Sequence, residues 1–283
     1  MPRYVLSRLR SRSGVERVFR ERFSEPLHLN VISGLVAIFG GVRSKTYFDL
    51  YVRPQFAFGV LHAADIAKRA GVSEIKVLEF GVATGTGLLN LSAIARRVTE
   101  ATGIAIEVIG FDGGAGLPEP RDYRDHPDLY TTGTFHMIDS DALVRRLPSN
   151  ARLILGEFER TVPEFLSECS SASPIGFASV DVDYYFSAVD TLKIFDGQAD
   201  WYLPVTTVYF DDIWFEQHNP WCGERLAIRE FNERHDLRKI APFTELRGKR
   251  LFKNARWIDQ TFTVHVLDHP ARQARQSPAP VGT

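Results

Sequence analysis

The stretch "VLEFGVATGTGLLNL", residues 77–91, carries the clearest structural signal in the sequence. It opens with a short apolar run that ends in an acid, Glu79, and it continues through three glycines into a leucine-rich segment. An apolar run, a glycine-rich turn and a helical pattern in this order are typical of a strand that leads into a helix at the ligand-binding edge of a sheet. The stretch therefore predicts an α/β protein that binds a ligand at this turn.

The composition excludes several other classes of protein. The 283 residues are 44% hydrophobic and 24% charged, with a formal net charge of −1. This balance does not favour a nucleic-acid partner. The two cysteines, Cys169 and Cys222, stand far apart and form no CxxC pair, so we expect neither a disulfide framework nor a zinc site. A reducing, cytoplasmic location fits this cysteine usage.

Apolar runs and helical patterns alternate through most of the chain. This alternation predicts a mainly parallel sheet covered by helices on both faces. We expect an N-terminal helical extension over 1–70, one catalytic domain over 71–269 and a disordered tail over 270–283. The expected strands are 75–80, 106–112, 151–158, 174–183, 205–212 and 261–268, and the expected helices are 56–70, 86–102, 141–147, 161–169, 186–195 and 223–235.

The N-terminus has two competing interpretations. Residues 3–22 carry seven arginines, and residues 26–42 contain no Asp, Glu, Lys or Arg. The uncharged stretch falls short of the ~20 apolar residues of a membrane-spanning helix, and a signal peptide would place its apolar core nearer the start. We therefore favour a buried helix or an oligomer contact, such as that of a homodimer, over stable membrane insertion. Loose contact of the arginines with a membrane surface stays open.

The residues around the turn indicate which ligand it binds. Gly81 and Gly85 let the backbone pass close to a ligand. No register of the turn supplies the dinucleotide fingerprint G-x-G-x-x-G or the G-K-[ST] ending of a P-loop. Glu79 would repel a pyrophosphate but suits a cationic ligand such as S-adenosylmethionine, and Asp112 is placed to accept hydrogen bonds from a ribose diol. A tight turn in an unrelated α/β protein is the alternative.

Four aspartates follow two consecutive predicted strands. Asp181 and Asp183 lie in the predicted strand 174–183 and point to the same face, because side chains alternate along a strand. Asp211 and Asp212 close the next strand, and adjacent strands lie about 4.8 Å apart. Carboxylates from both ends can thus converge on one cation, and an all-oxygen site suits Mg²⁺, Mn²⁺ or Ca²⁺ rather than zinc.

Six blocks of the chain resemble one family of enzymes. In order and spacing they are similar to those of the class I S-adenosylmethionine-dependent methyltransferases, and in particular to the macrocin O-methyltransferase family, whose members methylate sugar hydroxyls of natural products. Relatives described as cephalosporin hydroxylases share the pattern. The blocks lie within residues 75–235 and read EFGVATGTG, GFDGGAGLPEP, GEFERTVPEFL, VDVDYYFSAVDTL, FDDIW and GERLAIREF.

The resemblance implies a fold and a set of site residues. The fold would be the Rossmann-like class I methyltransferase fold, a mostly parallel seven-stranded sheet with helices on both faces. Residues 123–134 would form a mobile lid over the substrate. Mg²⁺ would bind Asp181, Asp211 and Asp212, and the cofactor would bind Glu79, Gly81 and Asp112.

These residues predict an S-adenosylmethionine- and Mg²⁺-dependent O-methyltransferase acting on a small hydroxylated natural product. Asp183 is the better candidate for general base, although Asp181 could take the proton instead. His218 is a candidate second base, or a structural loop histidine. Glu159 would lie near the adenine, or be a solvated acid at a helix start. A nicotinamide-dependent oxidoreductase and a non-catalytic scaffold of the same fold are the rival hypotheses.

Overall fold

The computed structural model describes residues 19–214 and 216–273. Its centre is a seven-stranded sheet with the order β3-β2-β1-β4-β5-β7-β6. The first five strands in the chain run parallel to one another, whereas β7 pairs antiparallel with both β5 and β6. The strands are β1 Glu74–Phe80, β2 Ala105–Asp112, β3 Ala151–Leu155, β4 Ile175–Val180, β5 Tyr202–Phe210, β6 Arg238–Pro242 and β7 Thr261–Val266.

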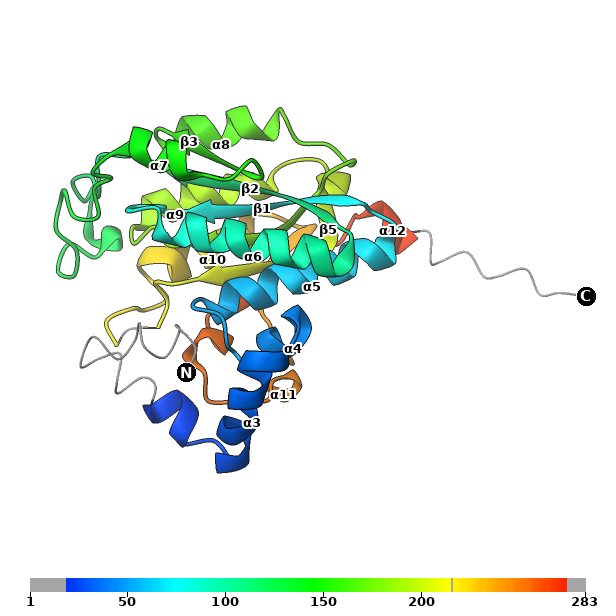
Figure 1. Cartoon of the computed structure of the whole chain (residues 1–283). Helices are drawn as coiled ribbons and strands as arrows, with labels where there is room; N and C mark the ends of the chain where they lie inside the picture. Colours follow the sequence, from blue (N-terminus) through cyan, green and yellow to red (C-terminus); the bar gives the residue numbers. More distant parts are fainter. Residues whose placement is uncertain (1–18, 215, 274–283) are drawn as a thin grey trace, which may run out of the picture.

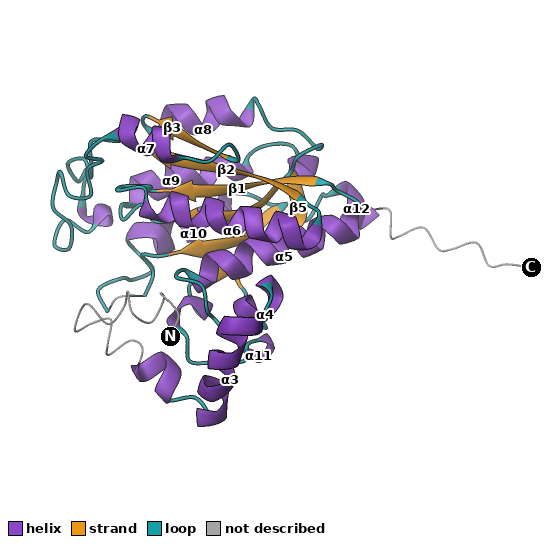
Figure 2. Ribbon diagram, in the orientation of Figure 1, coloured by secondary structure: helices purple, strands orange, loops and turns teal. Residues whose placement is uncertain are grey.

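Helices cover both faces of this sheet, as Figures 1 and 2 show. The main ones are α5 Pro54–Ala70, α6 Thr86–Thr102, α7 Ser140–Arg146, α8 Phe158–Leu166, α9 Tyr185–Leu192 and α10 Gly223–Arg234. The N-terminal part adds α3 Leu27–Phe39 and α4 Val42–Tyr47, and the short elements are η1 Phe19–Phe23, η2 Tyr123–Asp125, η3 Lys193–Phe195, η4 Ala199–Trp201, α11 Leu246–Lys249, η5 Arg256–Ile258 and α12 Pro270–Gln273.

The buried side chains form two hydrophobic clusters, one on each face of the sheet. Val77 of β1 packs with α5 and α6, whereas Leu78 and Phe80 pack with α8, α9 and α10. This division follows from the alternation of side chains along a strand. A parallel sheet needs both faces covered, and its central strand is accordingly buried on both.

The predicted fold is confirmed, a mostly parallel seven-stranded sheet with helices on both faces. Two details differ from the prediction. The strand β6 was not expected, because an edge strand that carries Arg238, Lys239 and Pro242 lacks the apolar pattern of a buried strand. The strand β4 ends at Val180, so Asp181 and Asp183 lie beyond it.

The N-terminal helices differ from the favoured interpretation of residues 26–42. A helix does form there, but the chain does not bury it, because Ser33 is the one buried residue of α3. Of the two predicted alternatives, the buried helix is therefore wrong, and the oligomer contact stays a prediction. Of the helices in the part of the chain that the structure describes, none has the length and apolar character needed to cross a bilayer. Residues 1–18, with most of the N-terminal arginines, and residues 274–283 of the predicted tail lie outside the described residues.

Candidate functional site

The acidic residues after β4 and β5 converge at the carboxyl edge of the sheet. Val180 pairs with Phe210 at the ends of these parallel strands, so the chain places Asp181 beside Asp211. Asp181, Asp211 and Asp212 each offer an oxygen within 4.8 Å of the others. Because the donors are all carboxylate oxygens, this acidic cluster fits a hard divalent cation such as Mg²⁺.

Asp183 lines a cavity together with Asp181, Asp211 and Asp212, but it lies in a turn after β4 rather than in the strand. The prediction that Asp181 and Asp183 share a strand face is wrong, because β4 has already ended and Asp183 adopts a φ of 58°. This left-handed conformation is uncommon for a residue with a side chain. The Asp183 N–H donates to Asp212 Oδ2 over 3.1 Å, so the turn fixes the orientation of the Asp212 carboxylate.

Glu224, at the start of α10, is a further acid of the site that was not predicted. Its side chain is fully buried, and its Oε2 accepts a hydrogen bond from the Asp212 N–H over 3.0 Å. Burial and the neighbouring aspartates raise the pKa values of Asp181, Asp212 and Glu224 well above their ordinary range. A cation among these groups would relieve the repulsion.

Gly81 lets the glycine-rich turn approach the loop after β4. Its φ is 83°, and a Cβ at this position would lie 1.8 Å from the carbonyl oxygen of Asp181. Asp112, at the end of β2, holds the other side of the turn, because its carboxylate accepts a hydrogen bond from the Ala83 N–H (2.7 Å). The same carboxylate accepts the Gly114 N–H (2.6 Å) of the loop that follows β2. The turn and the acidic cluster are therefore built against each other.

Glu79 lies beneath this turn rather than beside the cavity. It is 3% exposed, and its Oε1 would lie 1.9 Å from a Cβ at Gly87, so only glycine fits at that point of α6. Burial raises the pKa of Glu79 to about 8, although the Arg53 guanidinium opposes this shift. The structure therefore places Glu79 among the supports of the turn.

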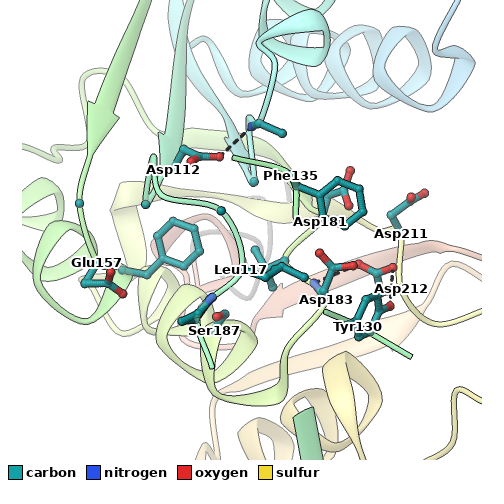
Figure 3. Close-up of a pocket in the computed structure, with 18 residues that line it drawn as sticks. Asp112, Leu117, Tyr130, Phe135, Glu157, Asp181, Asp183, Ser187, Asp211 and Asp212 are labelled. Carbon is teal, nitrogen blue, oxygen red and sulfur yellow. Dashed lines mark hydrogen bonds between the residues drawn. The ribbon is translucent and has the colours of Figure 1, made fainter. Parts of the chain in front are cut away.

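A cavity of about 440 Å³ joins Asp112 to the acidic cluster. Figure 3 shows Asp112 and Glu157 at one end and Asp181, Asp183, Asp211 and Asp212 at the other, with Leu117 between them. Phe135 also lines the cavity. Six carboxyl groups line this cavity, and none of the described residues that line it is a lysine or an arginine. The six are Asp112, Glu157, Asp181, Asp183, Asp211 and Asp212.

The connection between β2 and α7 closes over the cavity. It contains Tyr130, whose hydroxyl lies 3.2 Å from Asp212 Oδ1 and 3.1 Å from His218 Nε2. Burial lowers the pKa of His218 to about 4, so its imidazole is neutral at pH 7. Tyr130 lines the cavity, whereas His218 does not. Tyr130 therefore lies between His218 and the cavity.

The remaining predicted residues lie at the margin of the site. Gly85 is the N-cap of α6 and packs against Leu143. Glu159 lies in the first turn of α8 and is exposed, whereas Glu157, just before the helix, lines the cavity. A carboxylate at a helix start is a recognisable pattern, but the sequence does not show which of two neighbouring acids faces a ligand.

Comparisons with known proteins give structural likenesses only. No protein-family model and no curated protein was found to match the chain. The calicheamicin methyltransferase CalS11 is similar at 20% identity and a TM-score of 0.46, over 78% of this chain and 84% of that one. The plantazolicin methyltransferase BpumL, in complex with a triazolic desmethylPZN analogue and SAH, is similar at 8% identity and a TM-score of 0.35, over 93% of this chain and 96% of that one. The structure named cmcI-D160 Mg-SAM is similar at 16% identity and a TM-score of 0.35, over 71% and 69%.

Structural likenesses with TM-scores and identities this low do not indicate which reaction the chain catalyses. A shared fold hosts many unrelated functions, so the chemistry must be argued from the site.

Proposed function

We propose that this chain is an S-adenosylmethionine- and Mg²⁺-dependent O-methyltransferase that acts on a hydroxyl of a small natural product, a sugar hydroxyl in particular. One observation carries the proposal. The cavity extends from Asp112, an acid placed to bind a ribose, to the cluster of Asp181, Asp211 and Asp212. Six carboxyl groups line it, and no lysine or arginine does so among the described residues. Such a cavity favours cationic ligands.

The absence of lining cations in the described part of the chain separates this cofactor from a dinucleotide. A pyrophosphate is ordinarily held by backbone N–H groups at a glycine-rich helix start, often with a cation nearby. Here Asp112 accepts the N–H of Ala83 in the turn and the N–H of Gly114 in its own loop, and Glu157 adds a second negative charge. S-adenosylmethionine has an ammonium and a sulfonium group and no phosphate. Its ribose diol would lie at Asp112, and Phe158 offers an aromatic wall on the same side.

Asp181, Asp211 and Asp212 would hold the divalent cation. Bound there, the cation supplies Lewis acidity that lowers the pKa of an acceptor hydroxyl and fixes its direction. Asp183 would accept the hydroxyl proton at its carboxylate. Burial raises the pKa of Asp183 to about 6, so this group is still ionised at pH 7 and can act as a base.

The connection that carries Tyr130 would exclude water from the reacting groups and align the acceptor. Leu117 and Phe135 of the same connection line the cavity and offer apolar contacts to the acceptor beside its reacting hydroxyl. His218 would orient Tyr130, because its Nε2 faces the Tyr130 hydroxyl and its side chain does not line the cavity. The sugar-hydroxyl acceptor is supported by the resemblance of the six sequence blocks.

A methyl-transfer assay tests this function. The purified protein, isotopically labelled S-adenosylmethionine and a panel of glycosides and phenols are incubated with Mg²⁺ or with EDTA. We expect transfer with Mg²⁺ only, and a loss of at least about 100-fold in Asp211→Asn. The matched control is Asp236→Asn, an exposed aspartate between α10 and β6. Transfer that persists in EDTA or in Asp211→Asn would contradict the metal assignment.

A further inference from the structure

The helix α3 exposes an apolar surface that the described residues leave uncovered. Its sequence LHLNVISGLVAIF contains no charged residue. The exposed apolar side chains lie within one broad arc of the helix, opposite the buried Ser33, because they recur at spacings of three and four residues. This apolar arc consists of Leu27 (71% exposed), Val31 (66%), Ile32 (40%), Leu35 (59%), Ile38 (72%) and Phe39 (80%).

The body of the protein holds α3 in a fixed orientation. The buried Arg22 donates to Ser33 Oγ over 3.2 Å and to the carbonyl oxygens of Phe48 and Asp49, each over 2.7 Å. Its guanidinium also lies 4.0 Å from the centre of the Phe252 ring. Because these contacts hold the Ser33 side of α3 against the protein, the apolar arc on the opposite side faces away from it. Figure 1 shows α3 at the end of the N-terminal helices, remote from the carboxyl edge of the sheet.

The size of the apolar arc is that of an interaction surface. Six large apolar side chains, each 40 to 80% exposed, leave several hundred Å² uncovered. A standard protein interface contributes about 800 Å² from each partner, and monomers rarely expose larger contiguous apolar patches than a few hundred Å².

The charges near the arc favour a protein partner over a lipid surface. A helix that binds a membrane surface carries Lys or Arg on its polar face, and α3 has neither. The described charged residues just before it are two acids, Glu21 and Glu25, and two arginines, Arg20 and the buried Arg22, so this segment has no excess of positive charge. Arg43, after the helix, is paired with Asp65. An uncharged, apolar arc can meet its own copy without bringing like charges together.

We infer that α3 is the contact between two copies of this chain, with the apolar arcs packed against each other across a twofold axis. An isologous contact needs one self-complementary patch held in a fixed orientation, and α3 meets both conditions. The contact leaves the cavity of each copy open, because α3 lies away from the carboxyl edge of the sheet. This inference is independent of the proposed reaction.

Sedimentation velocity on the full chain, over a wide range of protein concentration, tests the contact. We expect a dimer for the wild type, and monomers for Val31→Glu/Leu35→Glu and for Val31→Lys/Leu35→Lys. Mixing the two variants should restore a dimer, because opposite charges then meet across the axis. The control Val144→Glu changes an apolar residue of α7 that is 51% exposed, and it should remain a dimer.

A wild-type chain that is monomeric throughout, or variants that dimerise as well as the wild type, would overturn the proposal. Unchanged circular dichroism would show that the variants fold. Flotation with vesicles of phosphatidylcholine and phosphatidylglycerol tests the rival occupant of the arc. Vesicle binding that both double variants abolish, with no dimer in solution, would assign the arc to a lipid surface instead.

Discussion

The Tyr130 hydroxyl lies 3.2 Å from Asp212 Oδ1, and this hydrogen bond joins the connection over the cavity to the acidic cluster. The two residues are distant in the sequence, and His218 contacts the same hydroxyl from the other side. Asp212 also accepts the Asp183 N–H. The covering segment and the proposed metal ligands are therefore coupled through one carboxylate.

Substitution of Tyr130 tests this coupling. We expect Tyr130→Phe, measured in EDTA, to lower the free energy of unfolding by about 1–3 kcal/mol, because a hydrogen bond to a buried carboxylate is lost. Amide exchange over residues 113–139 should become faster. The control Tyr123→Phe changes a side chain of the same segment that is 70% exposed, and it should have no effect. Equal stability and exchange in both variants would show that the hydrogen bond does not hold the segment.

A second prediction concerns the close approach at Gly81. We expect Gly81→Ala to lower the free energy of unfolding by at least ~3 kcal/mol, because its Cβ would lie 1.8 Å from the Asp181 carbonyl oxygen in addition to the strained φ. Gly103→Ala is the matched control. Gly103 has a φ of 80°, and a Cβ there would meet no atom within 4 Å, so only the ~1–2 kcal/mol of backbone strain should remain. Urea unfolding of both variants gives the comparison, and equal losses would contradict the predicted clash.

A third prediction concerns Glu79 and pH. Burial raises its pKa in the folded protein from 4.5 to about 8, so the folded state binds this proton more tightly than the unfolded state does. The resulting contribution to stability is complete below pH 4.5 and is lost as the pH rises to about 8, by up to ~1.4 kcal/mol per pH unit. We expect Glu79→Gln to gain stability over the wild type across this window. Glu100→Gln changes an exposed glutamate of α6 and is the matched control. A stability difference between Glu79→Gln and the wild type that stays constant across this window would refute the assignment.

A fourth prediction separates shape from charge at Glu224. The side chain accepts the Asp212 N–H, and its pKa is raised well above the ordinary range by burial and by the aspartates. Glu224→Gln keeps an acceptor and removes a buried acid, so we expect its stability in EDTA to equal or exceed that of the wild type. Glu224→Ala leaves a buried N–H unpaired, at a cost of about 1–3 kcal/mol. Chemical unfolding of both variants in EDTA measures these stabilities. Equal losses of unfolding free energy in the two variants would show that the carboxylate itself is required.

The sequence was sufficient to predict the parts of the fold that local pattern determines. The unit of β1, the glycine turn and α6 follows from an apolar run, a turn signal and a helical period, and all three are contiguous in the chain. The convergence of Asp181 with Asp211 followed from strand adjacency alone. The end of β4 did not follow, because alternation cannot reveal that Asp183 leaves the strand with a positive φ.

Other features depend on contacts that no local pattern contains. The edge strand β6 pairs with β7 despite its charged residues, because an edge position tolerates them. The exposure of α3 depends on which segments pack beside it. The amino-acid sequence of an apolar helix does not show whether the helix is buried or exposed. Tyr130 and Glu224 became site residues only through hydrogen bonds to Asp212 from other segments of the chain.

Calorimetric titration of the purified protein is the most direct test of the central claim, that the carboxylate-lined cavity binds S-adenosylmethionine and a divalent cation. S-adenosylmethionine and NAD⁺ are titrated separately, each with and without Mg²⁺. We expect micromolar binding of S-adenosylmethionine, no binding of NAD⁺, and a heat of Mg²⁺ binding that is lost in Asp211→Asn but kept in Asp236→Asn. Binding of NAD⁺ in place of S-adenosylmethionine would contradict the account and favour an oxidoreductase, and binding of neither would favour a scaffold.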